Sequence, residues 1–135
     1  MKLPWISLLS LFAWAAAYEC PGQFPSMLDP TFNDGAGAND DVFAITRDSA
    51  GRFLVGGQFT GFGPAPRGRL VRLSAGGDVD PGYFIGSGAN NNIYAVAVQA
   101  DGLVLMGGSF TQVNGQNRSY LARLDAGGNN SDPEF

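Results

Sequence analysis

The segment Leu103-Val-Leu-Met-Gly-Gly-Ser-Phe-Thr111 has a close copy upstream, Phe53-Leu-Val-Gly-Gly-Gln-Phe-Thr60. The pair Gly56-Gly57 and the pair Gly107-Gly108 are 51 residues apart (107 − 56 = 51). When residues 29–79 are aligned with residues 80–130 at this offset, 20 of the 51 positions are identical. Unrelated segments would share only a few positions, so the chain contains an internal duplication.

The duplication divides the chain into a series of segments. A first repeat spans 29–79 and a second spans 80–131, and a third repeat begins at 132–135. Each repeat opens with an Asp-Pro pair, at Asp29, Asp80 and Asp132. Residues 18–28 are punctuated by proline and glycine and are predicted to form an extended leader.

Residues 1–17 have the pattern of a signal peptide. Lys2 supplies a positive charge, an apolar run follows from Leu3 to Trp14, and Ala15-Ala16-Ala17 fits a cleavage site. The apolar run is short for a membrane span, which needs roughly 20 residues. We therefore predict cleavage after Ala17 and a secreted or cell-surface protein with no membrane segment after removal of the signal. A buried N-terminal helix or an uncleaved anchor is the alternative.

Composition restricts the class of protein. The 20 glycines and 8 prolines in 135 residues favour short strands and tight turns over long helices. Removal of Lys2 with the signal would leave seven arginines and twelve acids, a formal charge of −5 (7 − 12). The arginines are dispersed and form no basic stripe, which argues against binding to nucleic acid or to an anionic membrane. Cys20 is the single cysteine, so no internal disulfide is possible.

Each repeat predicts the same order of strands. The first strand is expected at Val42–Arg47 and at Ile93–Gln99; the second copy is apolar at almost every position, which is typical of a strand covered on both faces. Hairpin turns are expected around Gly51 and at Asp101-Gly102. The other expected strands are Arg52–Gly57 with Leu103–Gly108, Arg69–Ser74 with Tyr120–Asp125, and a short fourth strand near Val79–Phe84.

Two further features belong to this strand pattern. The segment Gly61–Gly68 and its counterpart Gln112–Asn117 are predicted to be loops. The glycine pairs Gly56-Gly57 and Gly107-Gly108 end their strands without side chains, so another backbone could approach there. No window of the sequence shows a sustained helical period.

Four short antiparallel strands per unit, at a period near 50 residues, predict an all-β fold of two tandem blade-like sheets, as in part of a β-propeller. The order of the motifs also resembles the delta-60 repeat. The motifs are Asp-Pro-x-Phe, Val-Phe-Ala-Ile, Gly-Gly-x-Phe-Thr and Arg-Leu-x-Arg-Leu-x-Ala-Gly-Gly, and together they cover residues 28–135. The resemblance implies a propeller-type repeat of secreted bacterial proteins and supplies no catalytic residues.

Closed propellers use about four to eight blades, and this sequence holds two repeats and the start of a third. Two blades alone would leave apolar sheet faces in water. Three interpretations follow: a fragment of a longer propeller, assembly with further copies of itself into a ring, and a unit that folds over its own faces.

No catalytic group of residues is visible. The chain has no histidine, and a single cysteine near the N-terminus provides neither a nucleophile with a base nor a zinc–thiolate site. Asp29, Asp80 and Asp132 could in principle act as a carboxylate pair for glycoside hydrolysis, but an aspartate before proline is first of all a turn signal. Arg72 and Arg123 recur once per repeat, which favours a structural ion pair or aromatic stacking over substrate binding.

Oxygen-rich loops at Asn39-Asp40-Asp41 and Asn90-Asn91-Asn92 raise the alternative of calcium binding, although the second copy lacks both acids. Asn117 and Asn129 lie in glycosylation sequons. We expect no catalytic residues, no metal and no cofactor. The expected function is a secreted, non-enzymatic module for protein or ligand interaction. The alternative is an extracellular calcium- or carbohydrate-binding module, and a hydrolase that uses the repeat carboxylates is less favoured.

Overall fold

The computed structural model describes residue 29 and residues 31–32, 37–83 and 85–129. The predicted signal peptide (1–17), the leader (18–28) and the start of a third repeat (132–135) lie outside these residues. Within the described residues every regular element is a strand, which confirms the all-β prediction. The described part of the chain includes no helix that is long and apolar enough to cross a membrane.

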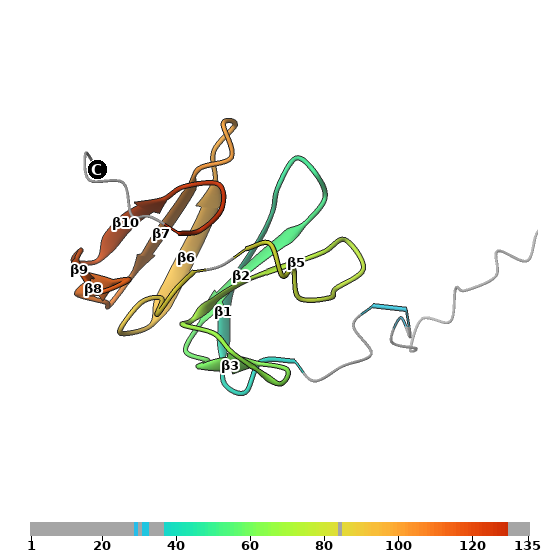
Figure 1. Ribbon diagram of the computed structural model, residues 1–135, viewed down its shortest axis with the longest axis horizontal. Helices are drawn as coiled ribbons and strands as arrows, with labels where there is room; N and C mark the ends of the chain where they lie inside the picture. Colours follow the sequence, from blue (N-terminus) through green and yellow to red (C-terminus); the bar gives the residue numbers. More distant parts are fainter. Residues whose placement is uncertain (1–28, 30, 33–36, 84, 130–135) are drawn as a thin grey trace, which may run out of the picture.

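The first repeat forms blade 1, a three-stranded antiparallel sheet in the order β1-β2-β5 (Figure 1). A two-stranded hairpin, β3-β4, accompanies this sheet. The strands are β1 (Val42–Arg47), β2 (Phe53–Gly57), β3 (Gly61–Phe62), β4 (Ala65–Pro66) and β5 (Leu70–Leu73).

The second repeat forms blade 2 with the same plan. Its sheet has the order β10-β7-β6, and β8-β9 is the accompanying hairpin. The strands are β6 (Ile93–Val98), β7 (Val104–Gly108), β8 (Gln112–Val113), β9 (Gln116–Asn117) and β10 (Leu121–Leu124). The two backbones agree in detail: Arg69 and Tyr120, which occupy the same repeat position, have positive φ angles of 65° and 69°.

The predicted strands are confirmed to within one or two residues, and two local predictions are wrong. The segments 61–68 and 112–117 are hairpins rather than loops, because Phe62 pairs with Ala65 and Val113 pairs with Gln116. The fourth strand near Val79–Phe84 is reduced to a single bridge between Leu73 and Val79. Each described sheet therefore has three strands instead of four.

The fourth strand ends early for a backbone reason. Asp80 donates its N–H to the Arg72 carbonyl (2.8 Å). The next residue, Pro81, has no N–H with which to continue the ladder. The chain then turns as Asp80 accepts a hydrogen bond from the Gly82 N–H (2.8 Å) and leads into blade 2.

Both predicted β-turns are present. Gly51 and Gly102 have φ angles of +84° and +86°, which place them in the left-handed region. The glycine pairs serve two purposes. Gly57 and Gly108 lie against the backbone of Asp41 and Asn92, and a Cβ at either position would collide with a carbonyl oxygen. Gly56 instead receives side chains from the neighbouring blade, as described next.

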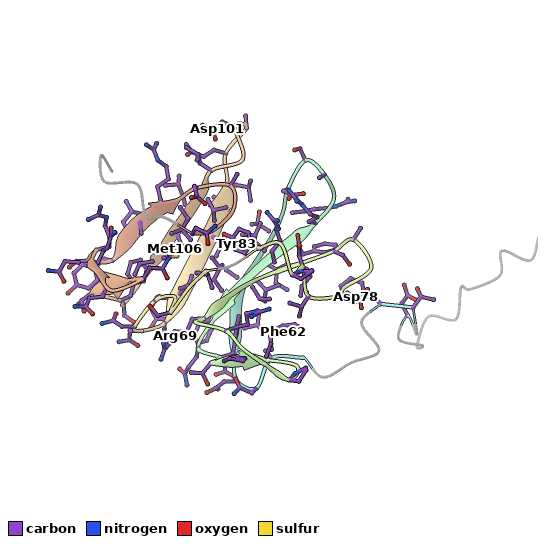
Figure 2. The ribbon with its side chains drawn as sticks, viewed as in Figure 1. Phe62, Arg69, Asp78, Tyr83, Asp101 and Met106 are labelled. Atoms are coloured by element: carbon purple, nitrogen blue, oxygen red, sulfur yellow. The ribbon has the colours of Figure 1, made fainter. Side chains whose placement is uncertain are left out.

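The two sheets pack face to face (Figure 1), and strand β6 lies against both β1 and β2. Leu54 and Leu70 of blade 1 are buried in one core with the inner face of blade 2, whose buried members include Ile93, Met106 and Leu124. Figure 2 shows Tyr83 at this junction. A Cβ at Gly56 would lie 2.9 Å from Ile93 and 2.8 Å from Val96, so the absence of a side chain at Gly56 lets β6 pack closely.

Burial on β6 differs from the prediction. A strand covered on both faces was expected, but only Ile93 is fully buried, and Tyr94, Ala95 and Ala97 are exposed. One face of β6 packs against blade 1. Among the described residues nothing covers the other face, so the apolar composition of this strand exceeds what the two blades need.

The matched glycines Gly56 and Gly107 provide a test of the junction. Gly56→Ala is expected to destabilise the fold by about 1–3 kcal/mol, because the new methyl group would overlap Ile93 and Val96. Gly107→Ala should change stability by about 0.5 kcal/mol or less, because its nearest neighbours would be 3.7 Å and 4.0 Å away. Urea unfolding at low protein concentration measures both changes. Equal effects at the two positions would contradict this account of the junction.

Candidate functional site

The outer face of blade 1 carries an apolar groove of about 350 Å³. We call it the aromatic groove and define it by its eight lining residues: Phe32, Ala38, Val42, Ile45, Phe53, Val55, Phe62 and Leu73. Phe32 meets Phe53 edge to face, with ring centroids 5.8 Å apart. Val42 is 41% exposed and Ile45 is 65% exposed, so this apolar surface is open.

The outer face of blade 2 carries a shallower apolar hollow of about 160 Å³. We call it the leucine face and define it by five of its lining residues: Ala95, Ala97, Leu105, Gly107 and Leu121. The strand register places these residues together, because Ala95 and Leu121 both pair with Gly107, and Ala97 pairs with Leu105. Leu121 is 52% exposed.

Both surfaces repeat positions that are buried inside the molecule. At the offset of 51 residues, Leu105 and Leu121 correspond to Leu54 and Leu70, which are 1% and 0% exposed at the junction between the blades. The eight groove residues correspond to eight members of the junction core in blade 2: Tyr83, Ala89, Ile93, Val96, Val104, Met106, Val113 and Leu124. Among the described residues there is thus one complete blade junction, and two open faces that correspond to the two sides of that junction.

The predicted repeat residues Arg72 and Asp80 meet at the junction. Arg72 Nε donates to Asp80 Oδ2 (2.8 Å), and Arg72 Nη1 donates to the Ala126 carbonyl of blade 2 (3.0 Å). Its guanidinium also lies 4.4 Å from the ring centroid of Tyr83. The arginine, which is 9% exposed, therefore combines an ion pair with aromatic stacking and ties blade 1 to blade 2.

Electrostatics at this junction favour the charged pair. Burial raises the pKa of Asp80, but the Gly82 N–H and the Arg72 guanidinium lower it by more, so the pKa lies below the usual value of 3.8. Asp48 behaves similarly: burial raises its pKa, and the backbone N–H and guanidinium of Arg52 outweigh that effect. Burial raises the pKa of the Tyr83 hydroxyl well above its ordinary value.

The other sequence-predicted positions do not join this cluster. Asp29 accepts two hydrogen bonds from Thr31, from the backbone N–H (2.9 Å) and from the hydroxyl (2.6 Å), and so closes its own turn. Asp132 lies outside the described residues. Arg123 is half-buried on β10, where it pairs with Leu105 of β7.

The oxygen-rich loops are engaged in holding the turns. The side-chain oxygen of Asn39 accepts backbone N–H bonds from Thr60 and Gly61, both at 3.0 Å. Asn90 repeats this with Thr111 (2.9 Å) and Gln112 (3.1 Å). No cluster of three or more carboxylate, histidine or cysteine side chains that could hold a metal occurs in the described part of the chain.

Two further surface features lie at the junction. Phe43 and Tyr94 are the extra residues at matching bulges in β1 and β6, and their rings are 5.3 Å apart. A separate cleft of about 400 Å³ is lined by Arg67 and Arg69 together with Ile85 and Ser87. Arg69 Nη1 donates across the junction to the Ala89 carbonyl (2.7 Å), so this arginine also joins the blades.

Sequence reasoning did not identify the aromatic groove or the leucine face as surfaces. The necessary signal was present in the offset of 51 residues, which assigns Ile45 and Leu121 to positions that are apolar in both repeats. What was missing was the strand register, which decides which of these residues share a face.

Comparison with known proteins agrees with the propeller architecture. Two segments, residues 51–83 and 99–129, match a family described as a β-propeller domain of unknown function, DUF5122. The first segment covers β2 to β5 of blade 1 and the first residues of the second repeat, and the second segment covers β7 to β10 of blade 2. No curated protein and no solved structure matches the chain. The chain is thus a β-propeller-type repeat protein with two described blades.

The pKa values predict how stability depends on pH. The pKa values of Asp48 and Asp80 are lower in the folded protein than their ordinary value of 3.8. Each ionised carboxylate therefore stabilises the fold above that value, and the contribution is lost as pH falls from about 4 through the lower folded pKa. We expect the free energy of unfolding to be nearly constant from pH 5 to 7 and to decline below pH 4. The Asp80→Asn variant should show a shallower decline, measured by urea unfolding at each pH.

The arginine at the junction can be tested against a surface arginine. Arg72→Met is expected to destabilise the protein by about 3 kcal/mol, because it removes the short ion pair of the largely buried Asp80 carboxylate and leaves only the 4.0 Å contact with Arg52. Arg52→Met is the matched control. Arg52 pairs with Asp48 at 2.7 Å and reaches Asp80 only at 4.0 Å, and its side chain is 39% exposed, so the cost should be about 1 kcal/mol or less. Comparable losses in the two variants, measured by thermal or urea unfolding, would refute the role assigned to Arg72.

Proposed function

We propose that this protein is an exported, non-enzymatic propeller module that binds another protein through its two free sheet faces. The observation that carries the proposal is the repeated burial pattern. Leu70 is fully buried at the internal junction, and its counterpart Leu121 is half exposed. Val42 is exposed in the aromatic groove, and its counterpart Ile93 is fully buried.

The energetics support a binding role. Full burial of a leucine, isoleucine or phenylalanine side chain contributes about 1.5–3 kcal/mol. The aromatic groove and the leucine face together expose several such side chains, among them Ile45 and Leu121. Large contiguous apolar patches on soluble proteins mark interaction sites.

The assignment as non-enzymatic is supported by what the ionisable groups contact. Asp29 accepts a hydrogen bond from Thr31 within its own turn, and Asp48 forms an ion pair with Arg52. Asp80 forms an ion pair with Arg72 and accepts a hydrogen bond from the Gly82 N–H. These contacts stabilise turns and the blade junction. General acid–base chemistry would instead need carboxylates directed into a cleft with separated pKa values.

Export is proposed from residues 1–17, whose apolar run and Ala15-Ala16-Ala17 motif fit a signal peptide. Expression of the full chain in a secreting host should release a product that begins at Tyr18. Intact-mass measurement and N-terminal sequencing of the protein from the medium would establish this. Retention of the complete N-terminus on cell-associated protein would refute it.

The binding role predicts the behaviour of the purified protein. The free protein should bind an apolar fluorescent dye or associate above micromolar concentration. A double variant, Ile45→Arg with Leu121→Arg, should lose both properties with little change in unfolding free energy, because both side chains are already exposed.

Ser49→Arg is the control for the added charge, because Ser49 is exposed in the turn between β1 and β2, away from both faces. Sedimentation velocity and dye fluorescence provide the measurements. A wild-type protein that neither associates nor binds the dye would show that these faces are not binding surfaces.

A further inference from the structure

The junction between the blades is directional. Leu54 and Leu70 lie on one face of the blade 1 sheet. They pack against the face of the blade 2 sheet that corresponds, in the repeat, to the other face of blade 1. The receiving positions in blade 2 are the counterparts of the aromatic groove of blade 1. The contributing positions in blade 1 are the counterparts of Leu105 and Leu121 on the leucine face.

We infer that the partner is a second copy of this chain, which seats its leucine face in the aromatic groove and repeats the internal junction. The inference rests on the proposed function and names the partner of those same faces. The argument is complementarity: in the junction between Leu54, Leu70 and blade 2, the protein already shows how these two kinds of face fit together.

The close approach at Gly56 supports the same docking. Within the molecule, Ile93 and Val96 pack onto Gly56, which has no room for a Cβ. The counterparts are Gly107 on the leucine face and Val42 and Ile45 in the aromatic groove. Gly107 is open in the single chain, and Val42 and Ile45 are exposed, so both sides of this contact are available to a second copy.

A polar contact of the junction also has a counterpart. Arg72 Nη1 donates to the Ala126 carbonyl of blade 2. Arg123 is the counterpart of Arg72, and Ala75 is the counterpart of Ala126. The equivalent bond between copies would join Arg123 of one copy to the Ala75 carbonyl of the next. Ala75 is exposed in the turn after β5, so it is accessible to a second copy.

One position departs from the internal junction. Gly68 passes so close to Gly88 and the Ser87 carbonyl that a Cβ on Gly68 would collide with them. The counterpart of Gly68 is Ser119, which has a side chain. The contact between copies is therefore wider at this point, and removing the Ser119 side chain should tighten it.

The two faces differ, so the contact between copies is head to tail rather than symmetric. A head-to-tail contact produces a ring when its rotation closes. Propellers close with about four to eight blades, so two to four copies with two described blades each would supply a closed ring.

Complementary variants test the direction of docking. Leu121→Arg blocks the leucine face and keeps the aromatic groove, whereas Ile45→Arg does the reverse. Each variant alone should lose all species larger than a monomer in sedimentation velocity at about 100 µM. An equimolar mixture should form a one-to-one dimer and stop there, because only one junction can be made. The Ser49→Arg variant should retain the wild-type oligomer.

Glycine variants test whether the internal junction is the template. Gly107→Ala should weaken association at least tenfold while leaving the unfolding free energy unchanged, because its methyl group would meet Val42 and Ile45 of the next copy. Ser49→Thr adds one methyl group in the exposed turn between β1 and β2, outside the proposed contact, and should leave association unchanged. Ser119→Gly should strengthen association several-fold.

The outcomes separate this inference from the proposed function. If one single variant still dimerises on its own, the contact is symmetric; this overturns the inference and leaves a binding role for that face. A wild-type protein that stays monomeric but binds the apolar dye also overturns the inference and retains the proposed function. A monomer that binds no dye overturns both.

Discussion

Leu54 and Leu70 of blade 1 are buried in the core of blade 2, and the stability of the molecule depends on this contact. A sheet with an apolar face must bury that face against another layer of structure, and each blade here lacks such a layer of its own. The junction supplies the missing layer. The twelve buried residues of its core include members from both repeats, whereas the second, smaller core belongs to blade 1 alone.

The other features of the junction follow from this burial. Gly56 must lack a side chain so that Ile93 and Val96 can reach the sheet. Arg72 lies at the edge of the core, where it forms an ion pair with Asp80, stacks on the ring of Tyr83 and donates a hydrogen bond to a carbonyl of blade 2. A buried guanidinium requires such partners, since burial without them is costly. Asp80 is suited to this task because it stands at the turn where the chain passes from one blade to the next.

The sequence predicted the repeat and the strands because both depend on local signals. The period of 51 residues, the Asp101-Gly102 turn and the apolar run at Ile93–Val98 can all be read directly from the sequence, without knowledge of which strands pair. The hairpins at 61–68 and 112–117 were missed because Pro64 and Asn114-Gly115 indicate turns, and the two-residue strands beside them are too short to give a pattern. The fourth strand was overpredicted because Val79, Tyr83 and Phe84 are strand-forming residues, although Pro81 between them prevents the pairing. An ion pair or aromatic stacking was predicted for Arg72. Its hydrogen bond to the Ala126 carbonyl joins residues 54 positions apart and could be identified only from the structure.

Retention of apolar side chains on both outer faces indicates the environment for which the repeats are suited. Terminal units of repeat proteins normally present a polar outer face, which keeps the array soluble. Neither blade has this property. Ile45 is the most exposed large hydrophobic residue of blade 1, whereas its counterpart in blade 2, Val96, is half-buried. Leu121 is half exposed, whereas its counterpart in blade 1, Leu70, is fully buried. Substitution of either residue by a polar one would cost the isolated chain little, because both side chains already lie in water. Both repeats therefore have the apolar composition expected of interior blades, which agrees with the proposal that a further blade packs against each face.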